Sequence, residues 1–143
     1  MVANQGELIM RNLLDGLIDK HKSFAEKASL SLVAEKYSPE FGGSACLIYS
    51  DGEVSLMITK SRDGVIYDCG AGEWQSDNWY SMDIIWNYLN HNAEYRKMKN
   101  SNHFSFFQES FPQIAELFRS SEKDRTAREL KKLELSRSKK LFG

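Results

Sequence analysis

The side chains best suited to binding a partner are concentrated in residues 63–95. This window of 33 residues contains six acids and no lysine or arginine, and it holds all three tryptophans: Trp74, Trp79 and Trp86. Aromatic rings mixed with carboxylates suit a protein-binding surface, because rings act as desolvated anchors and carboxylates steer a basic partner into contact. The same carboxylates would repel a nucleic acid.

We predict that seven residues of this window form the binding surface: Asp68, Glu73, Trp74, Asp77, Trp79, Tyr80 and Asp83. The alternative is structural, with Trp79 and Trp86 filling the core beneath a sheet while the acids only solvate a face. This alternative is favoured for Trp86, which stands beside Ile85 in a helical pattern. It is less suited to Trp74, which lies in a glycine-flanked loop between acids.

Motifs for catalysis are missing from the sequence. His21, His91 and His103 are scattered, with no HExxH pair and no cysteine at metal-ligand spacing, so we expect neither a metal site nor a cofactor. There is also no GxSxG, Walker or GxGxxG motif. The closely spaced carboxylates could serve hydrolysis, but nothing in their spacing gives two of them different environments. The sequence therefore predicts a protein that is not an enzyme.

A region of opposite charge follows the acidic window. Residues 1–95 hold 14 acids and 7 bases, a net charge of −7, whereas residues 96–143 hold 6 acids and 12 bases, a net charge of +6, which together give −1. The basic end suggests an alternative function, a nucleic-acid-binding or regulatory module acting through a C-terminal helix. Acids are interleaved there and stacking aromatics are few, so a helix that complements the acidic body is the favoured interpretation.

Composition also limits the cellular setting. No run of 18 apolar residues is present, which argues against a membrane span, and the first ten residues carry Glu7 instead of a basic region followed by an apolar one. Two cysteines, Cys46 and Cys69, without a CxxC pair fit a reducing compartment. We expect a cytoplasmic protein without membrane association, and the sequence leaves its oligomeric state open.

The elements that position the acidic window can be predicted from periodicity. Helical spacing of apolar residues predicts an amphipathic helix over residues 6–22. Alternation with a period of two then predicts a strand that ends near Pro39. Two Asp-Gly pairs, at 51–52 and 63–64, predict tight hairpin turns and hence an antiparallel meander of about four strands.

The register of the meander follows from its two turns. With each Asp-Gly pair as a two-residue loop, Leu47 lies opposite Leu56 and Ile58 lies opposite Cys69. Cys46 projects from the face opposite to that of Cys69, so the two could not form a disulfide. One face carries a continuous set of apolar side chains: Ala45, Leu47, Tyr49, Val54, Leu56, Ile58, Val65, Tyr67 and Cys69.

Helices are predicted after the meander. Ser81 is suited to cap a short helix that carries Asp83 in its first turn and ends near Asn90. A phenylalanine-rich helical pattern then contains Pro112, where we expect one helix to break and another to begin. Residues 122–143 read as a charged helix with a thin apolar seam from Ala127, Leu130, Leu133 and Leu141.

Together these elements predict an α+β fold. An N-terminal helix precedes the meander, and the C-terminal helices pack on one face of the sheet. We expect a single domain over residues 1–143, with a globular body at 1–121 and the charged helix after it.

Four features follow one another along the chain: residues 41–46 (FGGSAC), the hairpin at 55–67 (SLMITKSRDGVIY), the acidic loop with Trp79 and the short helix after it. Their order resembles that in small bacterial immunity proteins. Those proteins belong to polymorphic toxin and contact-dependent growth inhibition systems. The resemblance covers about residues 40–90. It implies that the turn at 62–64 is structural and not catalytic. Immunity proteins diversify quickly, so contact residues cannot be carried over.

The resemblance implies function by binding. An immunity protein neutralises a cognate toxin, commonly a nuclease, by blocking its site or its substrate groove. We therefore expect the acidic and aromatic surface to cover a cationic groove of a toxin domain. Neither nucleic acid nor a membrane is a predicted partner.

Overall fold

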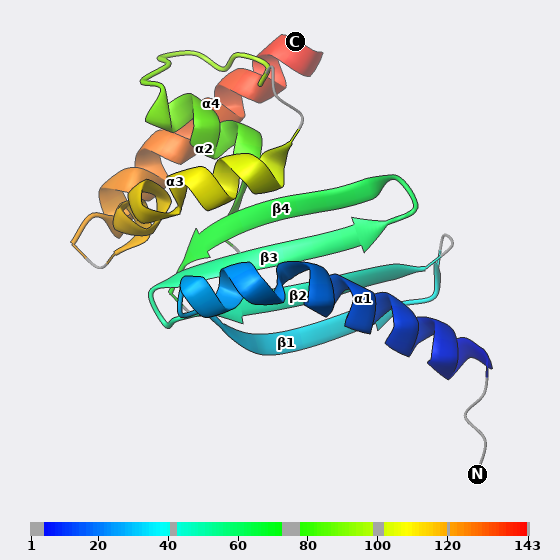
Figure 1. The fold of residues 1–143 in the computed structure, drawn as a ribbon. Coiled ribbons are helices and arrows are strands. Elements are labelled where there is room, and N and C mark those ends of the chain that lie inside the picture. The colour runs from blue at the N-terminus through cyan, green and yellow to red at the C-terminus, as the bar shows by residue number, and fades with distance from the viewer. Residues whose placement is uncertain (1–4, 41–42, 73–77, 99–101, 120, 143) are drawn as a thin grey trace.

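The computed structural model describes residues 5–40, 43–72, 78–98, 102–119 and 121–142. Within them the fold is α+β, with an N-terminal helix, an antiparallel meander and three further helices, as predicted (Figure 1). The meander has five strands, because a short fifth strand follows the acidic loop. The elements are α1 (Gln5–Lys27), β1 (Ser31–Ser38), β2 (Ser44–Ser50), β3 (Val54–Ser61), β4 (Gly64–Ala71), β5 (Trp79–Ser81), α2 (Met82–Leu89), α3 (His103–Phe118) and α4 (Lys123–Phe142).

Helix α1 is longer than the periodicity predicts. It extends past the predicted end at residue 22, because Phe24 and Ala25 continue its apolar face onto the core. Ser29 then takes a positive φ of 58°, a left-handed conformation that commonly closes a helix. The chain is thereby turned directly into β1.

The hairpin registers differ from the prediction by two residues. Leu47 lies opposite Ile58 instead of Leu56, and Ile58 lies opposite Tyr67 instead of Cys69. A shift of two residues keeps every side chain on the same face of a pleated strand. The predicted division of side chains between the two faces is therefore correct, although the predicted partners are wrong.

The turn geometries explain this shift. At the first turn the carboxylate of Asp51 accepts hydrogen bonds at 2.9 and 2.8 Å from two backbone N–H groups that follow it, which holds a wider loop. At the second turn Gly64 pairs with Ser61, so Arg62 and Asp63 form the loop. Each Asp-Gly pair marks a turn, but neither pair is itself the whole loop.

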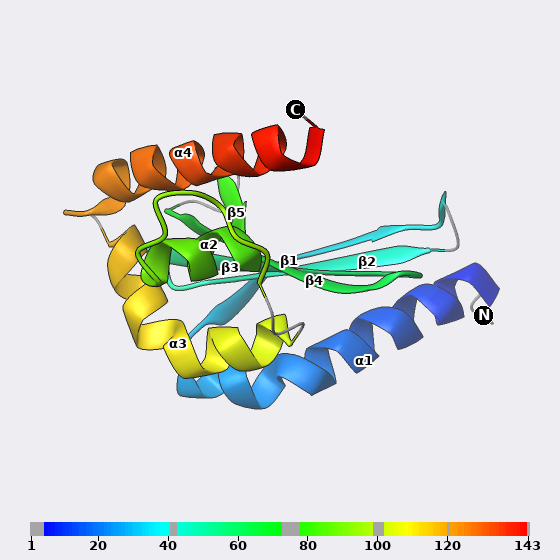
Figure 2. The same cartoon turned by 90° about the horizontal axis from the view of Figure 1, so that it is seen from above.

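The core lies between one sheet face and the helices. Figure 2 shows α1 and α3 on the same side of the sheet. The apolar set predicted for this face is buried, apart from half-buried Val65. Tyr67 of β4 stacks on Phe104 of α3, with ring centroids 5.3 Å apart. Ile84 and Ile85 of α2 complete the core at the β5 end. Both cysteines are free: Cys69 lies in this core and Cys46 on the other face.

Two helix predictions need correction. The break expected at Pro112 does not occur, since α3 runs through it from His103 to Phe118. Proline costs a helix one backbone hydrogen bond, but Phe107 and Ile114 are fully buried on either side of it and hold the helix to the core. In α4, Leu130 and Leu133 are buried as expected, whereas Leu141 is 61% exposed, because the core does not reach the last turn.

Candidate protein-binding site

The sheet face opposite the core carries no helix between β1 and β4 in the described part of the chain, and we call it the helix-free face. Figure 2 places α4 near its β5 end. Ile66 of this face is 53% exposed, and Met57, Thr59 and Asp68 are half-buried. Ile48, Ser50 and Ser55 of the same face are buried, so only part of the face is open. The open part, with its mixed apolar and polar side chains, is suited to contact another protein.

The loop predicted to bind begins and ends on the helix-free face. The hydroxyl of Ser55, which lies on this face, donates to the carbonyl of Gly72 at 2.9 Å. On the return, the carbonyl of Asn78 covers Gly70 so closely that a Cβ atom there would lie 2.6 Å from its oxygen. Trp79 pairs with Gly70 in the sheet, so its side chain shares this face. The predicted residues Glu73, Trp74 and Asp77 stand between these two ends and lie outside the described residues.

Asp68 is the acid that the helix-free face presents. Burial and the negative charge of Asp83 raise its pKa, and the positive charges of Arg137 and His103 offset only part of this effect. No hydrogen bond to its carboxylate occurs within the described residues. No fully buried side-chain oxygen or nitrogen of the described residues lacks a hydrogen-bond partner, so the carboxylate oxygens of Asp68 remain accessible to solvent or to another molecule.

Asp83, by contrast, is satisfied within the fold. Its carboxylate accepts hydrogen bonds from the hydroxyls of Ser81 and Tyr95, the latter at 2.8 Å, and forms an ion pair with Arg137 at 3.2 Å. Burial alone would raise the pKa of Asp83, but these hydrogen bonds and the guanidinium together hold it below its usual value. Asp83 thus connects α2 to α4, and little of its carboxylate is left for a partner.

Tyr80, Trp79 and Trp86 also differ in whether the side chain lies in the core or toward the surface. Tyr80 is 4% exposed and stacks on Phe118 in the core, with ring centroids 6.4 Å apart. Trp79 is half-buried at the edge of the helix-free face, and Trp86, for which a core position was favoured, is only half-buried on α2. The structure therefore brings Asp68 and Trp79 together on one face and places Tyr80 in the core, while Asp83 lies beside this face, bonded to Ser81 and Arg137.

The predicted binding surface left out two side chains of this face, Met57 and Ile66. Both lie on the face opposite the predicted apolar set. The signal was present, because Ile48, Met57 and Ile66 interrupt a strict alternation of apolar and polar residues along the strands. Ile48 is buried within the structure, whereas Met57 is half-buried and Ile66 is 53% exposed, so part of this apolar surface is left open.

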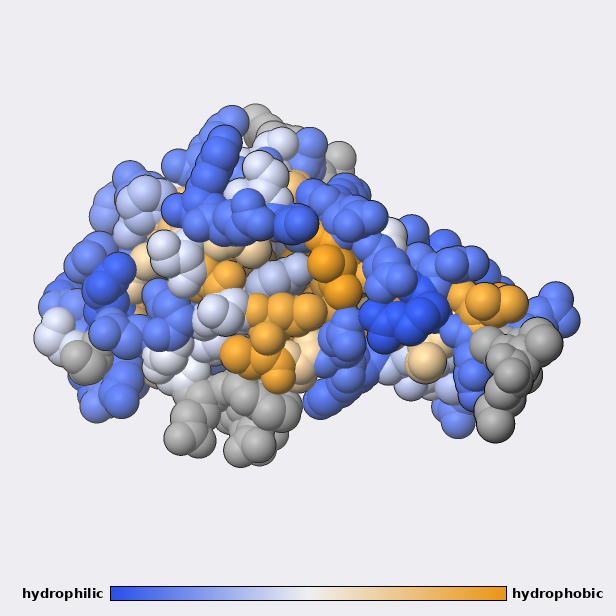
Figure 3. Space-filling model, turned by 60° about the horizontal axis from the view of Figure 1, so that its bottom comes forward, coloured by the Kyte–Doolittle hydropathy of each residue, from blue (hydrophilic) through white to orange (hydrophobic). Residues whose placement is uncertain are grey.

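The exposed edge of the sheet is a weaker candidate for binding. Figure 3 shows apolar surface near the β1 edge, where Leu32 and Val33 are 38% and 41% exposed. The register of β1 shifts between Leu32 and Ala34, which is a bulge, and charged Glu35 and Lys36 follow. Bulges and charges of this kind protect an edge strand from pairing with another strand. The helix-free face is therefore the stronger candidate for a binding site.

Several basic side chains of α4 form ion pairs with acids of the same protein. Arg137 pairs with Asp83, and Lys140 lies 3.9 Å from Glu94, so the helix neutralises two acids of the acidic window. Further bases pair with acids of the same helix, including Lys132 with Glu129 at 3.2 Å. These ion pairs occupy basic side chains that a phosphate-binding row would need.

Further comparisons add no site. Within the described residues, no group of three or more His, Cys, Asp or Glu side chains could hold a metal ion, and none of the described helices is long and apolar enough to cross a membrane. Comparison with protein-family models, curated proteins and solved structures gives no match for this chain.

Proposed function

We propose that this protein is an immunity protein, which binds and neutralises a cognate toxin domain through the helix-free face. The partner is a cationic protein, most simply a nuclease, whose substrate groove is covered by the bound protein. The contact residues are Asp68 and Trp79 together with the loop residues Glu73, Trp74 and Asp77. Tyr80 supports this surface from the core, and Asp83 supports it from the side by holding Ser81 and Arg137. The proposal includes a cytoplasmic location.

One observation carries the proposal: Asp68 is a half-buried carboxylate that accepts no hydrogen bond from another described residue, and it lies on the helix-free face where Arg137 of α4 comes near. A lysine or arginine of a docked partner would supply the missing donor and the opposite charge. Partner binding would then remove the cost that Asp68 imposes on the free protein. Charge pairs desolvated in this way slow dissociation, and removing one member weakens binding strongly.

The experiment is co-purification with the protein encoded directly upstream, followed by calorimetry of the purified pair. We expect Asp68→Asn to weaken binding by about tenfold or more. Asp63→Asn is the matched control, because Asp63 belongs to the same acidic window but lies exposed in the turn before β4. Its affinity should stay within about twofold of the wild type.

The outcomes separate the function from the surface. Absence of any complex with the upstream product would contradict the function. A complex whose affinity is the same in Asp68→Asn and the wild type would leave the function standing and contradict the surface. A double change, Glu73→Lys with Asp77→Lys, tests the loop, and it avoids Asp83, whose loss would disturb α4.

The alternative function, nucleic-acid binding through α4, has a direct test. Removal of residues 122–143 would also remove Leu130 and Leu133 from the core, so truncation is a poor experiment. Arg128→Glu with Lys139→Glu changes two exposed bases and keeps the core intact. Salt-dependent retardation of DNA or RNA that this pair of changes abolishes would favour the alternative over the toxin-binding proposal.

A further inference from the structure

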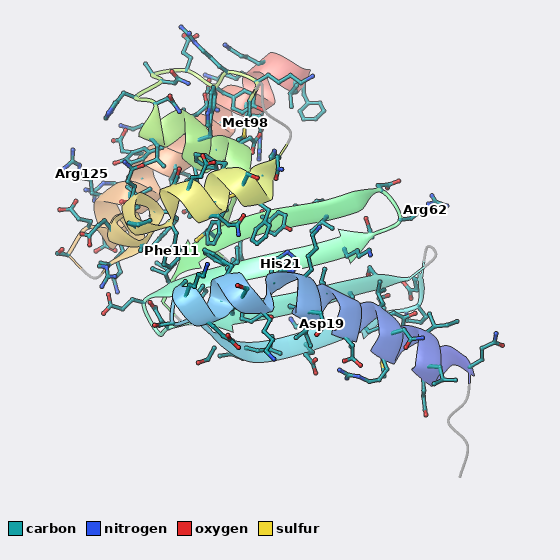
Figure 4. All side chains as sticks on the ribbon, in the orientation of Figure 1. Asp19, His21, Arg62, Met98, Phe111 and Arg125 are labelled. Carbon is teal, nitrogen blue, oxygen red and sulfur yellow. The ribbon has the colours of Figure 1, made fainter. Side chains whose placement is uncertain are left out.

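A groove between α1 and α3 is separate from the helix-free face. It consists of two adjoining hollows of about 400 and 490 Å³ that share Lys20 of α1. In Figure 4, His21 and Phe111 mark the region where the two helices meet. The floor is aromatic, since Phe24 packs edge-on against Phe104 and Phe111. Between residues 104 and 112 the groove follows α3 for roughly 12 Å.

The charges along this groove have one sign. Lys20 and Lys27 line it from α1, and His103 lines its far end from α3, while no acid is among its lining residues. Neither lysine forms an ion pair with another described residue. Two unpaired ammonium groups above an aromatic floor favour a ligand that has both an anionic and an apolar part.

The far end of the groove is lined by polar side chains. Tyr67 reaches it from the sheet, and its hydroxyl donates to Nε2 of His21 at 2.7 Å, because Nδ1 of His21 donates to the carbonyl of Leu17. The only proton of the Tyr67 hydroxyl is thus used within the protein, and this group cannot donate to a ligand. The hydroxyl of Ser105, in the first turn of α3, lines the same hollow. Lys20 supplies a positive charge where the two hollows join, and Ser105 supplies a hydroxyl in the second hollow.

We propose that this groove binds a small amphipathic carboxylate, a molecule with one carboxylate head and an apolar chain. The head lies by Lys20 and His103, and the chain lies along Phe24 and Phe111 toward Pro112. An inorganic anion would leave the aromatic floor unused, and a neutral apolar molecule would leave the ammonium groups unpaired. The carboxylate uses both parts of the groove.

The test is a titration of the intact protein with octanoate, followed by amide chemical shifts in NMR spectra. We expect saturable shifts at Phe24, Phe111 and His103, with a dissociation constant on the order of 1 mM or below. Lys20→Glu should weaken binding about fivefold or more. Lys22→Glu is the matched control, since Lys22 is exposed on the same helix and does not line the groove, and it should bind like the wild type.

Two further probes decide the chemistry. Octanamide has the same chain without the charge, and inorganic phosphate has charge without the chain. Both should shift the groove amides much less than octanoate at equal concentration. Equal binding of octanamide, equal binding of phosphate, no saturable binding of octanoate, or equal losses in Lys20→Glu and Lys22→Glu would each overturn the proposal.

Discussion

Arg137 of α4 lies with Nη1 3.2 Å from Oδ1 of Asp83 in the first turn of α2, and both side chains are less than one third exposed. The same guanidinium donates to the hydroxyl of Ser81 at 2.9 Å. The basic end of the chain is thus attached to the acidic window by a hydrogen-bonded ion pair. Net charge conceals this relationship, because the two regions nearly cancel.

Loss of that ion pair should destabilise the fold. Arg137→Ala leaves Asp83 half-buried without its cation, and we expect the free energy of unfolding to fall by about 1–3 kcal/mol. The measurement is urea unfolding at pH 7. Lys139→Ala, an exposed change two residues away, should cost no more than about 0.5 kcal/mol. Equal effects of the two changes would show that the ion pair contributes nothing specific.

Asp68 and Asp83 should affect stability with opposite signs. The pKa of Asp68 is raised in the fold, so its ionised form costs stability at neutral pH, and the cost disappears as pH falls through the folded pKa. We expect Asp68→Asn to raise the free energy of unfolding at pH 7 by up to about 1 kcal/mol.

The pKa of Asp83 is lowered in the fold, so its ionised carboxylate adds to stability above its unfolded pKa, and this gain is lost in more acidic solution. Asp83→Asn should therefore destabilise at pH 7. Unfolding curves from pH 3 to 7 check both signs, and a destabilised Asp68→Asn variant would contradict the account of that residue.

Gly70 should not tolerate even one added carbon. A Cβ atom there would lie 2.6 Å from the backbone oxygen of Asn78, so Gly70→Ala must displace the chain where the binding loop returns. We expect a loss of about 1–3 kcal/mol in thermal or urea unfolding. Gly16→Ala is the control, because no atom lies within 4 Å of the added carbon on α1, and it should stabilise by about 0.4–1 kcal/mol.

His21 should make the protein less stable in mild acid. It is 1% exposed, and burial lowers its pKa although the hydrogen bond to Leu17 acts in the opposite direction. A lowered pKa means that the unfolded chain binds a proton more readily, so stability falls as pH drops below about 6.5. Tyr67→Phe removes the hydroxyl partner of His21 and should cost about 1–3 kcal/mol at pH 7. Stability that does not change between pH 7 and 5 would contradict this assignment.

The fold was predictable from the sequence to the level of faces and elements. The apolar set from Ala45 to Cys69 lies on one face as expected, because face assignment depends only on whether a register shift is odd or even. The shift itself was not predictable, since it depends on the carboxylate of Asp51 bonding to its own turn. The helix through Pro112 also escaped prediction, because core contacts on both sides outweigh a local preference.

The candidate site was predictable only in part. Composition located the acidic window, but spacing alone could not show that Asp83 is engaged by Arg137, a residue 54 positions later. Nor could it show that Tyr80 faces the core while Trp79 faces away. That difference depends on β5, three residues long, pairing with β4. Short strands of this kind lack a periodic signal and form through tertiary contacts.

The most direct test of the central claim is the affinity of Asp68→Asn for the proposed partner, the protein encoded upstream, measured beside the unfolding free energy of the variant. The account predicts a variant that is at least as stable as the wild type and yet binds about tenfold more weakly or worse. A misfolded surface cannot produce that combination. Unchanged affinity in a stable Asp68→Asn variant would contradict the claim that the helix-free face binds the partner.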